Sequence, residues 1–295
     1  MKSKNLIKIR KQIRFLINFQ KTSKSISLIS SIKFQKVYRK ISKIMRNVFY
    51  LLAIFKEILK HHPHLALNII KANPKGKILV VVVGSDKGLA GLFDQSIFKE
   101  TENFLKDKDF YLGTIGSKPE KYFKRKYQLL FSFSKFENIL PESFAQELLS
   151  FFELIINENK INQIYLIRPN LTSVGFQVEV IKIFPLTLDA LEDLIEKIKV
   201  KTKEFGNLQL EESLKNFEYI LEPSPQVLTQ TIFNQISYLI IYALILQSQA
   251  SLEFVRTITM KKASENAEKI KEKEILGYNK LRQQKITEEL LDLRR

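Results

Sequence analysis

Apolar residues recur every three or four positions through the first 60 residues of the chain. The members of this series are Leu6, Ile9, Ile13, Leu16, Ile26, Ile29, Ile32, Val37, Ile41, Ile44, Val48, Leu51, Phe55 and Ile58. No glycine or proline interrupts the series before Pro63. Alternating spacings of three and four place one apolar seam along a helix, as in coiled coils. The pattern therefore predicts a single helix over residues 1–60 whose seam needs a partner.

The C-terminal part of the chain shows the same pattern. Pro223, Ser224 and Pro225 predict a helix start, with Ser224 as the N-cap and Pro225 at the first helical position. The apolar series that follows contains Leu228, Ile232, Ile236, Leu239, Ala243, Leu246, Ala250, Phe254, Ile258, Ile270, Leu276, Leu281, Ile286, Leu290 and Leu293. Because Gly277 is the only glycine and no proline follows Pro225, a second long helix is predicted over residues 224–295.

Between these helices the periodicity changes. Lys77–Gly84 is a run of apolar, mostly β-branched residues that ends in glycine, which is typical of a buried parallel strand. The other predicted strands are Phe110–Gly116, Gln128–Phe133, Gln163–Arg168 and Phe176–Phe184. Helices are predicted at Asp94–Lys106, Lys118–Lys126 and Glu142–Asn157, Leu188–Lys203 is predicted to be helical or mobile, and Phe217–Leu221 leads out of the domain. Alternating strands and helices indicate βαβ units on a mostly parallel sheet.

The predicted fold class is α/β. An antiparallel coiled coil of the N- and C-terminal long helices carries an inserted Rossmann-like α/β domain, with predicted boundaries at 1–60, 75–222 and 224–295. This pairing covers both apolar seams within one chain. The longest uncharged apolar runs, Val48–Phe55 and Ile236–Leu246, are shorter than the roughly 20 residues of a membrane-spanning helix. We therefore expect a protein without a membrane span, and the N-terminal residues show no signal-peptide pattern.

The net charge of +17 is concentrated at one end of the chain, because residues 1–60 contain 16 Lys or Arg residues and only one acidic residue, Glu57. We call six of these basic residues the basic stripe: Lys8, Arg10, Lys11, Arg14, Lys21 and Lys24. Such a stripe suits an acidic protein surface, lipid headgroups or nucleic acid, or is simply a solvated helix face. Aromatic residues that could stack on bases are sparse in this segment, which disfavours nucleic acid.

The sequence contains little that could carry catalysis. Cysteine is absent, which excludes disulfides, cysteine–zinc sites and thiol chemistry. His61, His62 and His64 surround Pro63, but neighbours in sequence rarely converge on one metal ion, so a solvated helix end is the favoured interpretation. The glycines of 84–92 match neither phosphate-binding fingerprint and favour a tight strand-to-helix turn. We predict no catalytic, cofactor-binding or metal-binding residue and no cofactor.

Five segments in four regions of the chain, in the expected order, resemble the gamma subunit of F-type ATP synthases. Residues 7–38 resemble the opening helix of that family, with its basic start and small polar centre. GSDKGLAGL at 84–92 resembles the loop after the first strand, and FEYILEPS at 217–224 resembles the run into the last helix. MKKASENA at 260–267 and YNKLRQQKITEE at 278–289 are similar to the signature segments of the C-terminal helix.

The resemblance implies the central rotor shaft, a non-catalytic subunit that transmits rotation between a membrane rotor ring and the alpha/beta catalytic hexamer. The partners that it implies are the alpha and beta subunits, epsilon- and delta-type subunits and a membrane rotor ring, with no nucleic acid. It also implies a peripheral place on the cytoplasmic face of the cell membrane. By resemblance, Arg256, Gln283 and Thr287, with Arg282 beside them, contact a beta subunit. The basic stripe would face acidic beta segments, and an apolar bearing would surround Leu290, Leu291 and Leu293.

A cluster of small polar residues in the first helix would allow the two helices to approach closely. Its members are Thr22, Ser23, Ser25, Ser27, Ser30 and Ser31. The chain departs from the family at Ile26, where a methionine is usual, at Ala90–Leu92, and near Ser251, where the family's glutamate appears one place late, as Glu253. These departures indicate a divergent member. Two alternatives to a conventional ATP synthase remain open: the shaft of a specialised F-type-like ATPase, such as a mycoplasma gliding motor, and a non-rotary coiled-coil scaffold.

Overall fold

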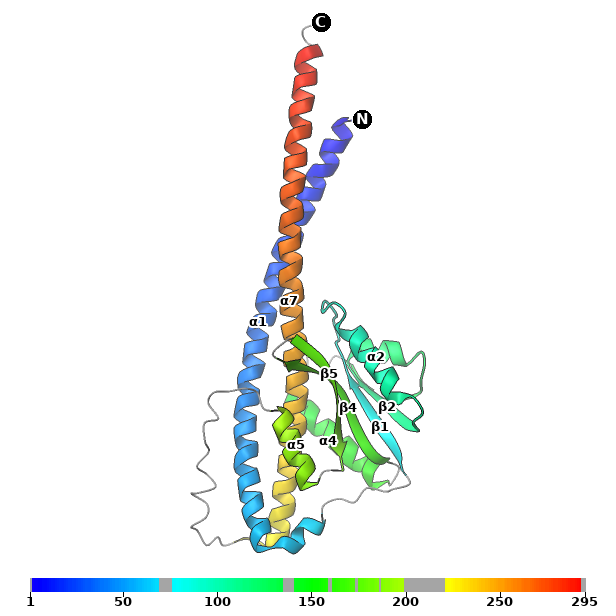
Figure 1. The fold of residues 1–295 in the computed structure, drawn as a ribbon, viewed down its shortest axis with the longest axis vertical. Coiled ribbons are helices and arrows are strands. Elements are labelled where there is room, and N and C mark those ends of the chain that lie inside the picture. The colour runs from blue at the N-terminus through cyan, green and yellow to red at the C-terminus, as the bar shows by residue number, and fades with distance from the viewer. Residues whose placement is uncertain are drawn as a thin grey trace. The chain divides into compact units, whose positions relative to one another are not determined.

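The structure is a computed structural model that describes residues 2–68, 76–134, 141–158, 161–172, 175–185, 187–198 and 221–292. The chain divides into two compact units. The helix-pair unit combines residues 1–33 with 253–295, and the sheet unit contains residues 34–252. Two long helices supply segments to both units: α1, Lys2–His61, and α7, Pro225–Asp292. They confirm the two predicted long helices (Figure 1).

Within the helix-pair unit the two helices run antiparallel. The Ser27 hydroxyl donates to the Thr257 carbonyl over 3.0 Å, and the Ser264 hydroxyl donates to the Gln20 carbonyl over 3.3 Å. Gln20 precedes Ser27 in α1, whereas Ser264 follows Thr257 in α7, so the two helices run in opposite directions. The first part of α1 therefore pairs with the last part of α7, as the antiparallel coiled coil requires.

The seam of this helix pair differs from the predicted one. Ser23 and Ser30 are each only 2% exposed, whereas the predicted seam residues Ile29 and Ile32 are 55% and 67% exposed. The prediction is wrong because it followed the apolar residues out of phase. The spacing of three and four that begins at Leu6 continues through the polar positions of the seam, Gln20, Ser23, Ser27 and Ser30.

The same phase error occurs in α7. The residues of its last half that are buried include Met260, Ser264 and Ala267, which again follow the three-and-four spacing. The predicted seam residues that are exposed instead are Ile258, Ile270, Leu276, Ile286 and Leu290. Both helices of this unit thus bury small or polar side chains, with Met260 beside them, and expose many of their large apolar side chains.

The sheet unit contains a five-stranded sheet with the order β3-β2-β1-β4-β5. The strands are β1 Lys77–Val83, β2 Phe110–Ile115, β3 Leu129–Phe133, β4 Ile161–Thr172 and β5 Gly175–Phe184. The first four run parallel, and β5 pairs antiparallel with β4. Right-handed βαβ crossovers produce such parallel neighbours, so the Rossmann-like prediction is confirmed.

Helices cover both faces of this sheet. The shorter helices of the unit are α2 Phe93–Leu105, α3 Ser117–Phe123, α4 Pro141–Asn157 and α5 Leu188–Ile198, with a 3-10 turn at Pro63–Asn68. Alternate β1 residues point to opposite sides: Leu79, Val81 and Val83 join the main core with α1, α4, α5 and α7. Val80 and Val82 are also fully buried but lie outside that core, as expected for the opposite face of the sheet, which α2 covers (Figure 1).

The start of α7 is as the sequence predicts. The Ser224 hydroxyl accepts the Val227 backbone N–H over 3.3 Å, as an N-cap does. Among the described helices α7 is the one long and apolar enough to cross a membrane by composition, yet 83% of its most apolar window is buried within the protein. Packing inside the sheet unit thus accounts for this apolar stretch.

Some predictions fall outside the described residues. These are residues 199–203 of the predicted Leu188–Lys203 segment and most of Phe217–Leu221. The domain boundaries 1–60, 75–222 and 224–295 stay a prediction, since the compact units cut across both long helices.

Candidate partner-binding surface

Small side chains set the spacing of the two helices in the helix-pair unit. Ser23 and Ser30 on α1, with Ala267 on α7, are at most 3% exposed. Interhelical distance depends on the side chains at the contact, and small residues allow close approach. The approach is close enough for serine hydroxyls of each helix to reach backbone carbonyls of the other. Lys271 adds a side-chain bond, with its ammonium 3.1 Å from the Gln20 side-chain oxygen.

A buried ion pair lies at one end of this seam. The Arg256 guanidinium is 2.9 Å from Glu253 Oε1, and their side chains are 7% and 9% exposed. Lys33 Nζ approaches the same oxygen at 3.8 Å from a half-exposed position. Glu253 Oε2 is buried and has no hydrogen-bond partner among the described atoms. The carboxylate therefore depends on Arg256 for most of its compensation.

The outer surface of the helix pair is apolar to an unusual degree. Thirteen of the twenty large apolar side chains that are exposed among the described residues belong to this smaller unit. On α1 they are Ile7, Phe15, Phe19, Leu28, Ile29 and Ile32, and on α7 they are Ile258, Ile270, Ile275, Leu276, Ile286, Leu290 and Leu291. We call these residues the outer apolar surface. Exposed apolar side chains gathered in this way mark a surface that other proteins cover.

The basic stripe lies on the same part of α1. All six of its side chains are exposed, and none forms an ion pair with the described part of the chain. The stripe is interleaved with exposed apolar residues such as Phe15 and Phe19, whose rings stack at 6.1 Å. Uncompensated positive charge beside apolar surface suits a partner whose own surface is apolar and acidic.

Comparison with known proteins gives this surface its context. A sequence profile of the family described as ATP synthase matches residues 5–294. The ATP synthase gamma chain of Syntrophus aciditrophicus is 30% identical over 242 residues, which cover 79% of this chain and 75% of that relative. The ATP synthase gamma chain of Mesoplasma florum is 25% identical over 296 residues, covering 98% of this chain and 96% of that relative.

The chain belongs to the ATP synthase gamma family. Solved structures of an ATP synthase rotor and of a central stalk contain chains of the same fold. The rotor of the Euglena gracilis mitochondrial ATP synthase aligns with a TM-score of 0.61 at 14% identity, covering 96% of this chain and 99% of that one. The central stalk of the Tetrahymena thermophila mitochondrial enzyme aligns with a TM-score of 0.56 at 18% identity, covering 82% and 99%. The chain therefore has the role of the central stalk in a rotary, membrane-bound enzyme complex.

The residues that the gamma-family resemblance assigns to beta contact are not brought together. Arg256 is 6% exposed and engaged in the ion pair, so little of its surface is available to a partner. Arg282, Gln283 and Thr287 are exposed, and the Thr287 hydroxyl bonds the Gln283 carbonyl over 3.0 Å. At 1.5 Å per residue, Arg282 lies about 39 Å along α7 from Arg256. In the isolated chain, Arg256 thus lies at one position on α7, and Arg282, Gln283 and Thr287 lie at another.

The structure describes two of the three residues that are predicted to lie in the apolar bearing. Leu290 and Leu291 are each 60% exposed, and Leu293 lies outside the described residues. Their exposure fits a surface that a partner covers. The small polar cluster divides: Ser23 and Ser30 are buried, Ser27 and Ser31 are partly buried, and Thr22 and Ser25 are exposed.

The glycine-rich loop after β1 satisfies its own polar groups. Asp94 accepts hydrogen bonds from the backbone N–H and the hydroxyl of Ser85, at 2.9 and 2.6 Å. Asp86 accepts bonds from the N–H and hydroxyl of Ser117, at the start of α3. The Asp86 carboxylate thus takes, at the start of α3, the kind of position that phosphates occupy in nucleotide-binding folds, while Asp94 of α2 holds the loop itself. With Gly88 and Gly91 at φ of 71° and 61°, this arrangement favours the turn interpretation.

The histidines at the end of α1 have an ordinary environment. His61 lies 3.2 Å from Glu57 in an exposed pair one turn apart, and the His62 and His64 rings meet edge to face at 6.0 Å. Among the described residues, no group of three or more His, Asp or Glu side chains is placed to hold a metal ion.

Sequence reasoning missed the outer apolar surface. The predicted seam includes seven of its thirteen members, because apolar residues are expected inside; these are Ile29, Ile32, Ile258, Ile270, Leu276, Ile286 and Leu290. The signal that could have located them is the strict three-and-four spacing from Leu16 to Phe34, which passes only through Gln20, Ser23, Ser27 and Ser30. Apolar residues off that spacing had to face outward.

Proposed function

We propose that this chain transmits rotation through direct contact of its helix pair with the alpha and beta subunits of the catalytic hexamer, and that it does not itself catalyse ATP chemistry. The observation that carries the proposal is the outer apolar surface, which two continuous helices display around a seam of small residues. A helix pair built in this way needs a protein enclosure. The enclosing subunits would bind nucleotide with a different affinity in each of their conformations. The face that the shaft presents to a subunit would favour one of these conformations.

Charge supports the same partner. The basic stripe carries six exposed cations without acidic partners in the described chain, so an acidic segment of a beta subunit is its proposed partner. Arg282, Gln283 and Thr287 form a second proposed beta contact nearer the end of α7, and Leu290, Leu291 and Leu293 the proposed bearing. Arg256 is proposed to support the first contact indirectly, through Glu253 and Lys33.

Other partners follow from the central-stalk role. We propose epsilon- and delta-type subunits and a membrane rotor ring as the neighbours of the complex, with the chain peripheral on the cytoplasmic face of the cell membrane. No nucleic acid is proposed as a partner.

Affinity isolation of the chain from its native cells, with identification of every co-purifying protein, tests this proposal. We expect alpha- and beta-type subunits in equal amounts, with epsilon- and delta-type subunits and a membrane ring. Recovery of the hexamer with unrelated proteins and no ring would assign the shaft to a specialised ATPase motor. Recovery of no hexamer subunit would contradict the proposal and favour a coiled-coil scaffold.

A further inference from the structure

On the face of the sheet that packs on α7, one charged side chain among the described residues is fully buried. Arg168 on β4 is 0% exposed, and its direct cross-strand neighbour on β5 is Glu179. One guanidinium nitrogen of Arg168, Nη2, lies 3.0 Å from Glu179 Oε2, whose side chain is 23% exposed. Burial lowers the pKa of Arg168 to about 10, against the attraction of Glu179. The charge is thus placed where it is costly to keep.

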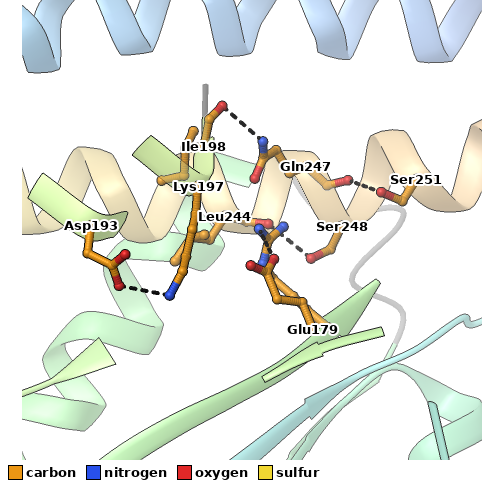
Figure 2. A network of polar contacts seen from close by, with 9 residues as sticks. Glu179, Asp193, Lys197, Ile198, Leu244, Gln247, Ser248 and Ser251 are labelled. Atoms are coloured by element: carbon orange, nitrogen blue, oxygen red, sulfur yellow. Dashed lines mark hydrogen bonds and ion pairs between the residues drawn. The ribbon is translucent and has the colours of Figure 1, made fainter. Parts of the chain in front are cut away.

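The pair is also incompletely hydrogen-bonded. Nε and Nη1 of Arg168 are buried without a partner among the described atoms. So is Oε1 of Gln247 on α7, while its Nε2 donates to the Ile198 carbonyl at the end of α5, over 3.2 Å. Figure 2 shows Glu179 reaching from β5 toward the part of α7 that holds Leu244 and Ser248. Arg168 and Gln247 thus carry buried polar atoms that the described part of the chain does not compensate, although buried polar groups are ordinarily hydrogen-bonded.

The part of α7 that precedes Gln247 shows why polar residues are needed to set the position of the helix on the sheet. Every residue from Leu239 to Leu246 is buried, so this stretch is apolar on all sides. Apolar contact is not directional, and the facing residues of the sheet, Ile164, Leu166, Ile181 and Ile183, are apolar as well. Such surfaces can pack at offsets of one helical turn, about 5.4 Å, with similar burial.

Polar residues at one point of α7 distinguish one of these offsets from the others. Gln247, Ser248 and Ser251 follow the apolar stretch immediately and are at most 9% exposed. A shift of one turn would bring Ala243 or Leu244 to the place of Gln247, which would leave the Ile198 carbonyl without its donor. It would also place apolar side chains against the Arg168–Glu179 pair.

We propose that Arg168, Glu179 and Gln247 specify the register in which the sheet packs on α7, and that they do so without adding net stability. A buried polar residue in a coiled-coil seam fixes register in the same way, at the expense of stability. The inference concerns the sheet unit alone and does not depend on the proposed contacts with the hexamer.

The test compares paired substitutions in the full-length chain. Glu179→Leu leaves the fully buried Arg168 charge unmatched and should lower the urea midpoint of unfolding, and Arg168→Met, which leaves the partly exposed Glu179 carboxylate unmatched, should lower it less. The double variant removes both charges, and we expect its midpoint to equal or exceed that of the parent. The matched control is Lys126→Met with Glu102→Leu, which removes an exposed ion pair of the same unit. We expect no change in the control.

Hydrogen exchange then reports register. In the double variant, peptides from residues 239–252 should exchange at least tenfold faster than in the parent and show two mass populations, because two packings coexist. Gln247→Leu should give the same two populations. A double-variant midpoint as low as that of the single variants would show that the pair stabilises the fold, and unchanged exchange in residues 239–252 would show that it does not set register. Either result overturns the proposal.

Discussion

Replacing Arg256 by alanine removes the closest partner of a buried carboxylate. The resemblance alone treats Arg256 as a contact residue whose loss leaves the helix intact. In the structure, the Arg256 and Glu253 side chains are 7% and 9% exposed and lie 2.9 Å apart. Breaking a buried pair by removing one partner destabilises a protein by about 3–5 kcal/mol. Since Lys33 stays at 3.8 Å from the same oxygen and is 53% exposed, we expect the lower value, about 3 kcal/mol.

Native-state hydrogen exchange of the full chain measures this locally. A loss of about 3 kcal/mol speeds exchange roughly a hundredfold, because each 1.4 kcal/mol is a factor of ten. The effect should appear in the α7 amides of residues 253–267. Arg282→Ala is the matched control, since that side chain is exposed and forms no ion pair with the described residues; its effect should stay within about 0.5 kcal/mol.

The companion variant separates a lost partner from lost packing. Replacing Glu253 and Arg256 together by methionine removes both charges and keeps apolar volume, so it should recover most of the lost stability. If Arg256→Ala exchanged no faster than Arg282→Ala, the carboxylate would not depend on the guanidinium, and the reasoning from burial would be refuted.

Three further predictions concern the surface and the seam. Ser23→Leu should overpack the seam and destabilise the helix pair by about 1–3 kcal/mol, whereas Ser25→Leu on the exposed side should be nearly neutral in the same urea titration. Ile32→Ser should weaken binding to alpha and beta subunits at least tenfold in a titration while leaving the unfolding midpoint unchanged; equal affinity would argue against the outer apolar surface as the contact. Glutamine at all six basic-stripe positions should slow association and flatten its salt dependence, with helix content by circular dichroism unchanged; an unaltered salt dependence would exclude the stripe from the encounter.

The sequence predicted the elements better than their contacts. The β-branched run at Lys77–Val83 and the uninterrupted three-and-four spacing each point to one structure, because strand and helix periods differ. The antiparallel β5 was predicted as a strand, and its direction becomes certain only through its register with β4. The cap at Ser224 follows from local chemistry and was predictable in full.

The seam of the helix pair was not predicted, for a physical reason. Apolar residues are expected to be buried within a chain that is surrounded by water. In a helix pair that other proteins enclose, apolar residues on the outside are buried by those partners instead. The apolar pattern therefore places Ile29 and Ile32 in the interior, whereas Ser23 and Ser30 were expected only to let the helices approach closely and not to form the seam. The ion pair of Glu253 and Arg256 was also beyond prediction, because both residues are polar and their burial depends on the phase of the seam.

A rotation assay tests the central claim most directly. The chain has no cysteine, so Lys99→Cys on the exposed surface of α2 gives one unique attachment point for a bead. The chain is assembled with alpha and beta subunits, the hexamer is fixed to glass, and ATP is added. The account predicts that the bead turns in one direction at a rate that depends on ATP concentration. A hexamer that hydrolyses ATP equally with and without the chain, while the bead stays still, would contradict it.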